Sequence, residues 1–127
     1  MADPDASGLQ GLCLLIVEDD WHIASDLAET LEGAGARVIG PVGSVKGALA
    51  LIAAQARLDG AVLDINLADE LVYPVADALA ARRVPFVFAT GYDAGVVPAA
   101  YATVTRHEKP VDLAALAADL ARKARMG

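Results

Sequence analysis

The sequence predicts a single α/β domain, a doubly wound parallel sheet with helices on both faces. Its 127 residues are a length typical of one domain. Short apolar runs of strand length alternate along the chain with segments of helical periodicity. Several of these runs end abruptly on a polar or charged residue. Five strand-helix alternations imply parallel strands joined by right-handed crossovers, and therefore a three-layer sandwich.

Five short runs are the expected strands. The first is a continuous apolar run, which is typical of a strand buried on both faces of a sheet. The strands are expected at Leu12–Val17, Arg37–Ile39, Ala61–Leu63 with Asp64 at the carboxyl end, Val84–Ala89 and Ala102–Arg106. A turn is expected at Gly40–Gly43, directly after the second strand.

Helical spacing of apolar residues places helices between and after these strands. Ser44 is the expected N-cap of the second helix, Pro74 lies in the first turn of the third, and Asp112 is the expected cap of the last. The expected helices cover about residues 23–33, 44–57, 74–82 and 113–125. Between the fourth and fifth strands, Gly95 and Pro98 weaken any helix.

Composition and charge limit the classes of function. Residues 1–10 are expected to be a disordered leader, which leaves 11–127 as the domain. The formal net charge of −7 argues against direct nucleic-acid binding, because phosphate binding needs Lys and Arg. No apolar stretch is long enough to span a membrane, and residues 1–10 lack the features of a signal peptide. The single cysteine, Cys13, cannot form an internal disulfide, so we expect the reducing cytoplasm.

Charged and polar side chains follow four of the five expected strands. Glu18, Asp19 and Asp20 follow the first, and Asp64, Thr90 and Lys109 come at or after the ends of the third, fourth and fifth. Parallel strands all end at one edge of the sheet, which is where ligands bind in open α/β folds. The sequence therefore predicts one site at this edge.

The chemistry of this set points to phosphoryl transfer. Converging carboxylates need a cation or raised pKa values, and ligands that are all oxygen select Mg²⁺. The Lys109 ammonium can pair with a carboxylate or a phosphoryl group, and Thr90 adds a hydroxyl beside the accessible Gly91 N–H. Together these groups suit transfer of a phosphoryl group to an Asp nucleophile. Asp20 is equally consistent with a helix cap.

From about Leu12 to the end of the last helix, the chain resembles the receiver domain of response regulators in two-component signalling, the CheY-like superfamily. The matching motifs are Leu15-Ile16-Val17-Glu18-Asp19-Asp20, Val62-Leu63-Asp64-Ile65-Asn66, Thr90 and Lys109-Pro110. The resemblance implies a flavodoxin-like (βα)5 fold with strand order 2-1-3-4-5.

The resemblance also implies a role for each site residue. Asp64 would accept the phosphoryl group from a histidine kinase or a phosphotransferase. Glu18, Asp19, Asp64 and the backbone carbonyl of Asn66 would hold Mg²⁺, for which Mn²⁺ or Ca²⁺ could substitute. Contacts to the phosphoryl group would come from Thr90, Gly91, Lys109 and the backbone N–H of Ile65. The peptide bond between Lys109 and Pro110 would be cis.

A narrower resemblance lies in Pro85-Phe86-Val87-Phe88-Ala89-Thr90-Gly91-Tyr92, which is similar to the signature of the "FAT GUY" receivers of alphaproteobacteria. Members of that group are single-domain regulators, typically paired with HWE-type histidine kinases. We expect the protein to be a monomer or weak dimer. We expect no output domain, and therefore signalling by protein contact or by passing the phosphoryl group on.

The chain departs from the usual receiver pattern in the region that reports phosphorylation. Arg106 stands where most receivers have a Tyr or Phe, and Tyr92 is the candidate replacement for this conformational readout. The interval from Thr90 to Lys109 is short by about three residues, close to one helical turn. We therefore expect a fourth helix that is short or mobile, and an altered dimerisation surface. Ala68 also stands where most receivers have Pro.

Other functions compete with the switch. The protein could be a phosphate sink for a shared kinase, or a degenerate receiver that binds partners without phosphorylation. A phosphatase with an Asp nucleophile is disfavoured, because it needs a second Asp as general acid where this chain has Asn66. We therefore expect no enzymatic activity beyond Mg²⁺-dependent self-phosphorylation and autodephosphorylation.

Overall fold

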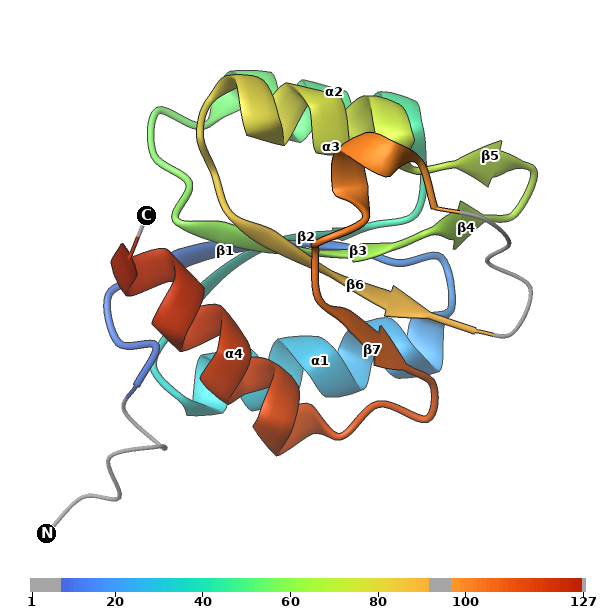
Figure 1. Cartoon of the computed structure of the whole chain (residues 1–127). Helices are drawn as coiled ribbons and strands as arrows, with labels where there is room; N and C mark the ends of the chain where they lie inside the picture. The colour runs from blue at the N-terminus through green and yellow to red at the C-terminus, as the bar shows by residue number, and fades with distance from the viewer. Residues whose placement is uncertain (1–7, 92–96, 127) are drawn as a thin grey trace, which may run out of the picture.

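The computed structural model describes residues 8–91 and 97–126. A five-stranded sheet lies between two layers of helices (Figure 1). Its strands are β1 (Cys13–Val17), β2 (Arg37–Val42), β3 (Gly60–Asp64), β6 (Phe86–Thr90) and β7 (Arg106–Glu108). The order is β2-β1-β3-β6-β7, and every neighbouring pair is parallel. Counted along the chain this is order 2-1-3-4-5, so the predicted fold class and topology are confirmed.

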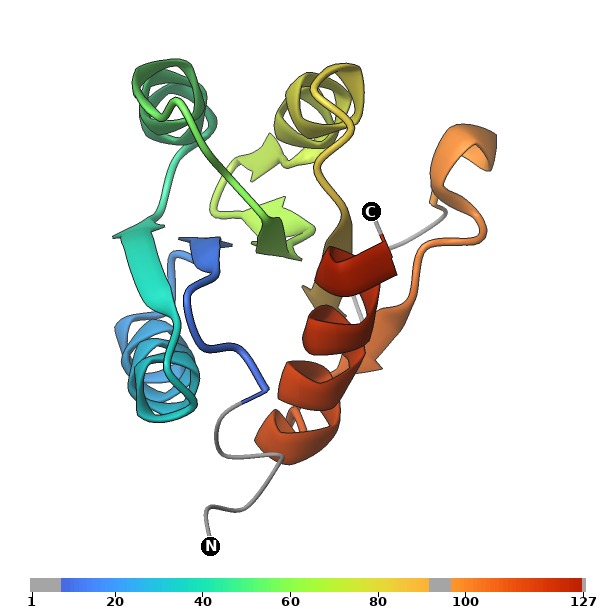
Figure 2. The same ribbon diagram turned by 90° about the vertical axis from the view of Figure 1, so that its left-hand side faces the viewer.

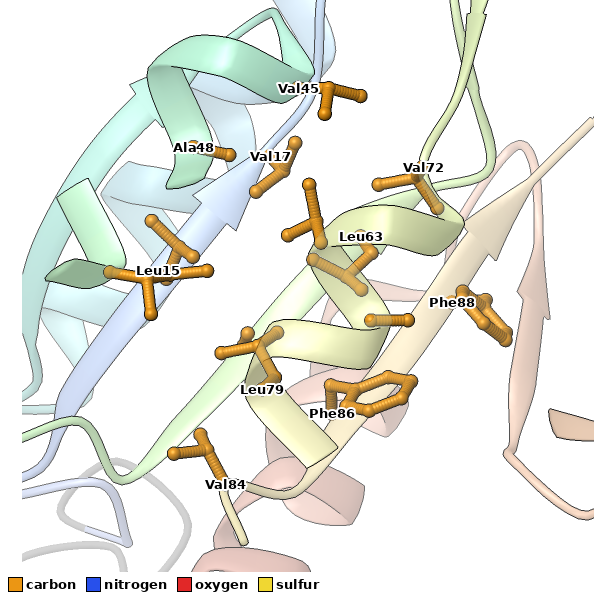
Figure 3. Packing of buried hydrophobic residues seen from close by; sticks show 14 of the residues in the cluster. Leu15, Val17, Val45, Ala48, Leu63, Val72, Leu79, Val84, Phe86 and Phe88 are labelled. Carbon is orange, nitrogen blue, oxygen red and sulfur yellow. The ribbon is translucent and has the colours of Figure 1, made fainter. Parts of the chain in front are cut away.

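Two helices cover each face of the sheet. One face carries α2 (Val45–Ala54) and α3 (Tyr73–Ala81), and the other carries α1 (Trp21–Gly33) and α4 (Leu113–Met126), as Figure 2 shows from the side. Each layer has its own apolar cluster. Figure 3 shows the cluster in which side chains of β1, β3 and β6 meet α2 and α3. None of the helices in the described ranges is long and apolar enough to cross a membrane.

The alternation of side chains along β6 explains how one strand serves both clusters. Phe86 and Phe88 belong to the cluster under α2 and α3, while Val87 and Ala89 belong to the opposite one. Successive side chains of a strand point to opposite faces, so Thr90 shares the face of the two Phe residues. This register places the Thr90 side chain at the end of a fully buried strand.

The predicted helix caps are present. Asp20 accepts hydrogen bonds from the N–H groups of His22 and Ile23, Ser44 accepts one from Gly47, and Asp112 accepts one from Ala115. Each bond satisfies a donor that the first turn of a helix leaves unpaired.

The second helix ends at Ala54, three residues before the predicted end at Arg57. The guanidinium group of Arg82, at the end of α3, donates to the carbonyl groups of Ile52, Gln55 and Ala56. These bonds satisfy carbonyl groups that a longer helix would have paired. The termination thus depends on a residue distant in sequence, which the local pattern does not show.

The predicted turn at Gly40–Gly43 is wrong, because β2 continues to Val42. The pairing shifts between Leu15↔Ile39 and Val17↔Val42, so Gly40 and Pro41 form a bulge opposite one residue of β1. Gly40 has φ +91°, and a Cβ there would lie 2.9 Å from the Ile16 carbonyl oxygen. A bulge in an edge strand accommodates both Gly and Pro.

The last strand is β7 (Arg106–Glu108), not the predicted Ala102–Arg106. A 3-10 turn, η2 (Ala99–Tyr101), precedes it, and the Tyr101 carbonyl accepts a hydrogen bond from Val104 N–H. Pairing with β6 begins only where the Phe88 N–H reaches the Thr105 carbonyl. The turn thus takes up residues that the pattern assigned to the strand.

The expected short fourth helix is confirmed. Between Thr90 and Arg106, the described residues contain only η2 as a helical element, in place of a helix of three turns. A small antiparallel hairpin that was not predicted follows β3 and consists of β4 (Asn66–Leu67) and β5 (Glu70–Leu71). Ala68 in its turn has φ +53°, a left-handed conformation that alanine rarely adopts.

Residues 1–7 of the expected leader lie outside the described residues. The folded domain begins earlier than the predicted residue 11, since Leu9 is 1% exposed and belongs to the cluster under α1 and α4. The Leu9 carbonyl accepts a hydrogen bond from Leu12 N–H, and Gly11 N–H bonds the Gly35 carbonyl. An isolated apolar side chain among polar residues gave no sign of this docking.

Candidate functional site

The carboxyl ends of β1, β3, β6 and β7 meet at one edge of the sheet (Figure 1). The register pairs Val17 with Leu63, Asp64 with Ala89 and Thr90 with Glu108. Glu18 follows the first of these strands directly and Lys109 follows the last. The parallel register therefore gathers residues that are up to 91 positions apart in sequence.

Three carboxylates converge at this edge. Glu18, Asp19 and Asp64 each offer one oxygen atom, and these atoms all lie within 4.8 Å of one another. Glu18 and Asp64 are buried, at 4% and 5% exposure, while Asp19 is exposed. The predicted cluster of these three acids is therefore formed, with one member facing solvent.

Lys109 provides the positive charge between the two buried acids. Its Nζ lies 2.8 Å from Glu18 Oε1 and 3.2 Å from Asp64 Oδ2. Burial alone would lower the pKa of Lys109, but the carboxylates of Glu18 and Asp64 outweigh this and raise it above its ordinary value. The side chain is thus a stable ammonium group in contact with the predicted nucleophile.

The Asp64 carboxyl group is a weaker acid than an ordinary aspartic acid side chain. Burial, followed by the neighbouring Glu18 carboxylate, raises its pKa from 3.8 to about 7, although Lys109 opposes the rise. One ammonium group does not offset the burial of two close carboxylates. A further cation at this position would favour the ionised form of Asp64.

Backbone N–H groups hold both buried carboxylates in place. Asn66 N–H lies 3.3 Å from Asp64 Oδ1, and Asp20 N–H lies 3.2 Å from Glu18 Oε2. Gly43 packs against the same loop, since a Cβ there would lie 3.2 Å from the Asp19 Cα. Gly43 was not among the predicted site residues, and its sequence neighbours give no sign of this close approach.

Thr90 and Gly91 lie where the sequence placed them, at the end of β6. Thr90 is buried, and its hydroxyl donates to the Gly91 carbonyl at 3.2 Å. Its own carbonyl accepts the Lys109 N–H at 2.9 Å, which ties the ends of β6 and β7 together. The peptide bond between Lys109 and Pro110 is cis, as predicted.

Of the two candidate readout residues, the structure describes Arg106 and places it outside the cluster. Tyr92 lies outside the described residues, and Arg106 is exposed on β7. Tyr101, which was not among the predicted site residues, is a buried tyrosine in the described part of this region. Its ring stacks on Tyr73 and its hydroxyl bonds Asp77 on α3. Burial and Asp77 raise the pKa of Tyr101 to about 12.

The donor set suits a hard divalent cation. All three side chains offer carboxylate oxygens, the ligand type that Mg²⁺ prefers, and the exposed Asp19 leaves one side of the cluster open for coordinated water. The raised pKa of Asp64 is a second indication of a cation site, because it shows that the buried carboxylates lack compensating positive charge.

Ile65, whose backbone N–H was a predicted phosphoryl contact, is fully buried directly after Asp64.

Solved structures with the same fold include SdrG from Pseudomonas melonis Fr1 in its BeF3-activated conformation. It is 39% identical with a TM-score of 0.70, over 91% of this chain and 96% of SdrG. A CheY-like response regulator receiver domain from Methylobacillus flagellatus is 28% identical (TM-score 0.72), over 86% of this chain and 95% of that domain. The response regulator PhyR from Brucella abortus is 21% identical (TM-score 0.77) over 97% of this chain, which spans about half (52%) of PhyR. No family model and no curated protein matched the chain.

Proposed function

The chain belongs to the CheY-like receiver domains of response regulators, and we propose that it is a signalling switch phosphorylated on Asp64. The observation that carries the proposal is the contact of Lys109 Nζ with both Glu18 and Asp64, at 2.8 and 3.2 Å. A strand-end carboxylate next to a fixed ammonium and two further acids has the surroundings that phosphoryl transfer requires.

In the proposed reaction an Asp64 oxygen attacks the phosphorus of a phosphohistidine. The P–O bond forms as the P–N bond breaks, and the imidazole nitrogen takes the electron pair as the leaving group. The Asn66 N–H and Lys109 orient the Asp64 carboxylate before attack. Lys109 then turns from the carboxylate to the phosphoryl oxygens, to which the Thr90 hydroxyl and the Gly91 and Ile65 N–H groups also donate.

Glu18, Asp19, Asp64 and the Asn66 carbonyl would hold the Mg²⁺, with Mn²⁺ or Ca²⁺ as substitutes. When bound, the ion neutralises charge on the phosphoryl oxygens. The chain's own contribution is to keep Glu18 and Asp64 buried and oriented through the N–H groups of Asp20 and Asn66. Asn66 has no acidic proton to give to a leaving group, so we propose slow loss of the phosphoryl group in place of phosphatase activity.

We further place the chain among the "FAT GUY" receivers, on the motif Pro85–Tyr92 and on the short η2 turn. The partners would be an HWE-type histidine kinase or a phosphotransferase and a downstream protein in the cytoplasm. The protein would act as a monomer or weak dimer. Support comes from the short interval between Thr90 and Lys109, which would alter the face that receivers use to dimerise.

Beryllofluoride, a phosphoryl mimic, tests the proposal directly. With Mg²⁺, NMR spectra should show shifts of the Thr90, Gly91 and Lys109 amides that are lost in Asp64→Asn. The matched control is Asp69→Asn, which removes an exposed acid five residues away and should respond as the wild type does. An unresponsive wild-type protein would favour a degenerate receiver.

A further inference from the structure

Asp119 on α4 is a buried charge that the proposed reaction does not use. In the described ranges four polar or charged residues are buried, and Glu18, Asp64 and Thr90 belong to the site. Asp119 is the fourth, at 5% exposure. Burying an unpaired carboxylate costs roughly several kcal/mol, even after the protein has relaxed around the charge. Its partners therefore show what the burial achieves.

Each oxygen of Asp119 has a different partner. Oδ2 lies 3.0 Å from His107 Nε2, and Oδ1 pairs with Arg122 one turn along α4. The Arg122 side chain is 64% exposed, whereas that of His107 is 14% exposed. The bond to Arg122 stays within the helix and faces solvent. The bond to His107 crosses from α4 to β7.

This crossing bond acts on the short strand that carries Lys109. β7 has three residues and lies at the edge of the sheet, so only β6 pairs with it. His107 pairs with Ala89, and two residues later the Lys109 N–H bonds the Thr90 carbonyl. A second tie to α4, from Lys123 Nζ to Thr105 Oγ1 at 2.7 Å, lies at the start of the strand.

The placement of Lys109 is sensitive to small shifts of this strand. Its Nζ reaches two carboxylates at 2.8 and 3.2 Å, and functional groups generally need to be held within about 0.5 Å of a productive geometry. We propose that Asp119, acting through His107, is a positioning residue that fixes β7 and so aims Lys109 at Asp64. The inference rests on the proposed function, in which Lys109 receives the phosphoryl oxygens.

The test compares Asp119→Ala with Arg122→Ala, which removes only the solvent-side partner. Loss of a supporting contact behind a reactive group typically costs about tenfold or more in activity. We expect Asp119→Ala to slow phosphorylation by acetyl phosphate about tenfold at saturating Mg²⁺, with the Kd for Mg²⁺ unchanged. Arg122→Ala should react at the wild-type rate. Asp119→Asn, which can still accept the His107 hydrogen bond, should recover most of the rate.

A double-mutant cycle separates positioning from general damage. In a Lys109→Ala background, Asp119→Ala should have no further effect on the rate, because its effect passes through Lys109. Additive losses, or equal rates for Asp119→Ala and wild type, would overturn the inference.

Amide hydrogen exchange of Lys109 in the unphosphorylated protein gives an independent test. Faster exchange in Asp119→Ala but not in Arg122→Ala is expected even if acetyl phosphate does not react, whereas unchanged exchange would count against positioning.

Discussion

The Lys109 ammonium lies 3.2 Å from Asp64 Oδ2, although Asp64 ends β3 and Lys109 directly follows β7, on the other side of β6. The contact joins the predicted nucleophile to the residue that would bind its product. It does not fully compensate the burial of Asp64, whose pKa is raised to about 7. The site therefore has too little positive charge to balance its two buried carboxylates. This imbalance has measurable consequences for stability and metal binding.

Ionisation of Asp64 should destabilise the fold. In the folded protein Asp64 keeps its proton up to about pH 7, whereas the unfolded chain releases it near 3.8. The contribution of protonated Asp64 to the stability of the folded state is thus complete below pH 4 and is lost as the pH rises through 7. Asp64→Asn should be more stable than wild type at pH 8 and lose this advantage near pH 4, since each pKa unit corresponds to about 1.4 kcal/mol. Urea unfolding without metal at both pH values measures it, and a difference independent of pH would contradict the assignment.

Metal binding should compete with the Asp64 proton. A cation needs the ionised carboxylate, so Mg²⁺ affinity should fall about tenfold for each pH unit below 7. Above pH 8 it should become constant. Titration followed by Trp21, which is 73% exposed and lies two residues from Asp19, measures the affinity. Asp69→Asn should leave the curve unchanged, and a Kd that is flat from pH 5 to 8 would contradict competition between the cation and a proton on Asp64.

Two neighbouring tyrosines should respond oppositely to loss of a hydroxyl. The Tyr101 hydroxyl bonds Asp77, so Tyr101→Phe should destabilise by about 1 kcal/mol. The Tyr73 hydroxyl is buried, and among the described residues it has no hydrogen-bond partner. Tyr73→Phe should therefore be neutral or stabilise by up to about 1 kcal/mol. Thermal unfolding of the two variants checks the signs, and equal destabilisation would refute the Tyr101 bond.

The left-handed Ala68 should be improved by glycine. Its φ of +53° costs an alanine roughly 1 kcal/mol, so Ala68→Gly should stabilise the protein by about that amount, less the entropy that glycine adds to the unfolded chain. Ala50→Gly, on the exposed face of α2, is the control and should destabilise by about 1 kcal/mol. A loss of stability in Ala68→Gly would contradict the hairpin geometry.

Local patterns were enough to predict the three central strands and the residues that meet at their ends, whereas the strand order followed from the family resemblance. Continuous apolar runs gave β1, β3 and β6, and because parallel strands share one edge, Glu18, Asp64, Thr90 and Lys109 could be placed together. The Ser44 and Asp112 caps followed from side-chain preference alone. These features depend on a few adjacent residues, which is why the sequence pattern specifies them.

The errors came from contacts between segments that are distant in sequence. The end of α2 depends on Arg82 and the start of β7 on the turn at Tyr101. The β2 bulge at Gly40 and the docking of Leu9 depend on packing against the sheet and the helices below it. The pair of Asp119 and His107 left no local signal, because a lone His and a helical Asp are ordinary surface residues in most sequences.

Phosphorylation at Asp64 is the central claim, and mass spectrometry of the chain treated with acetyl phosphate and Mg²⁺ tests it most directly. The account predicts one phosphoryl group with the lability of an acyl phosphate, released by base and by hydroxylamine and located on the peptide that contains Asp64. It should be absent from Asp64→Asn and present in Asp69→Asn. A phosphoryl group on another residue, or none under conditions where Mg²⁺ binds, would contradict the account.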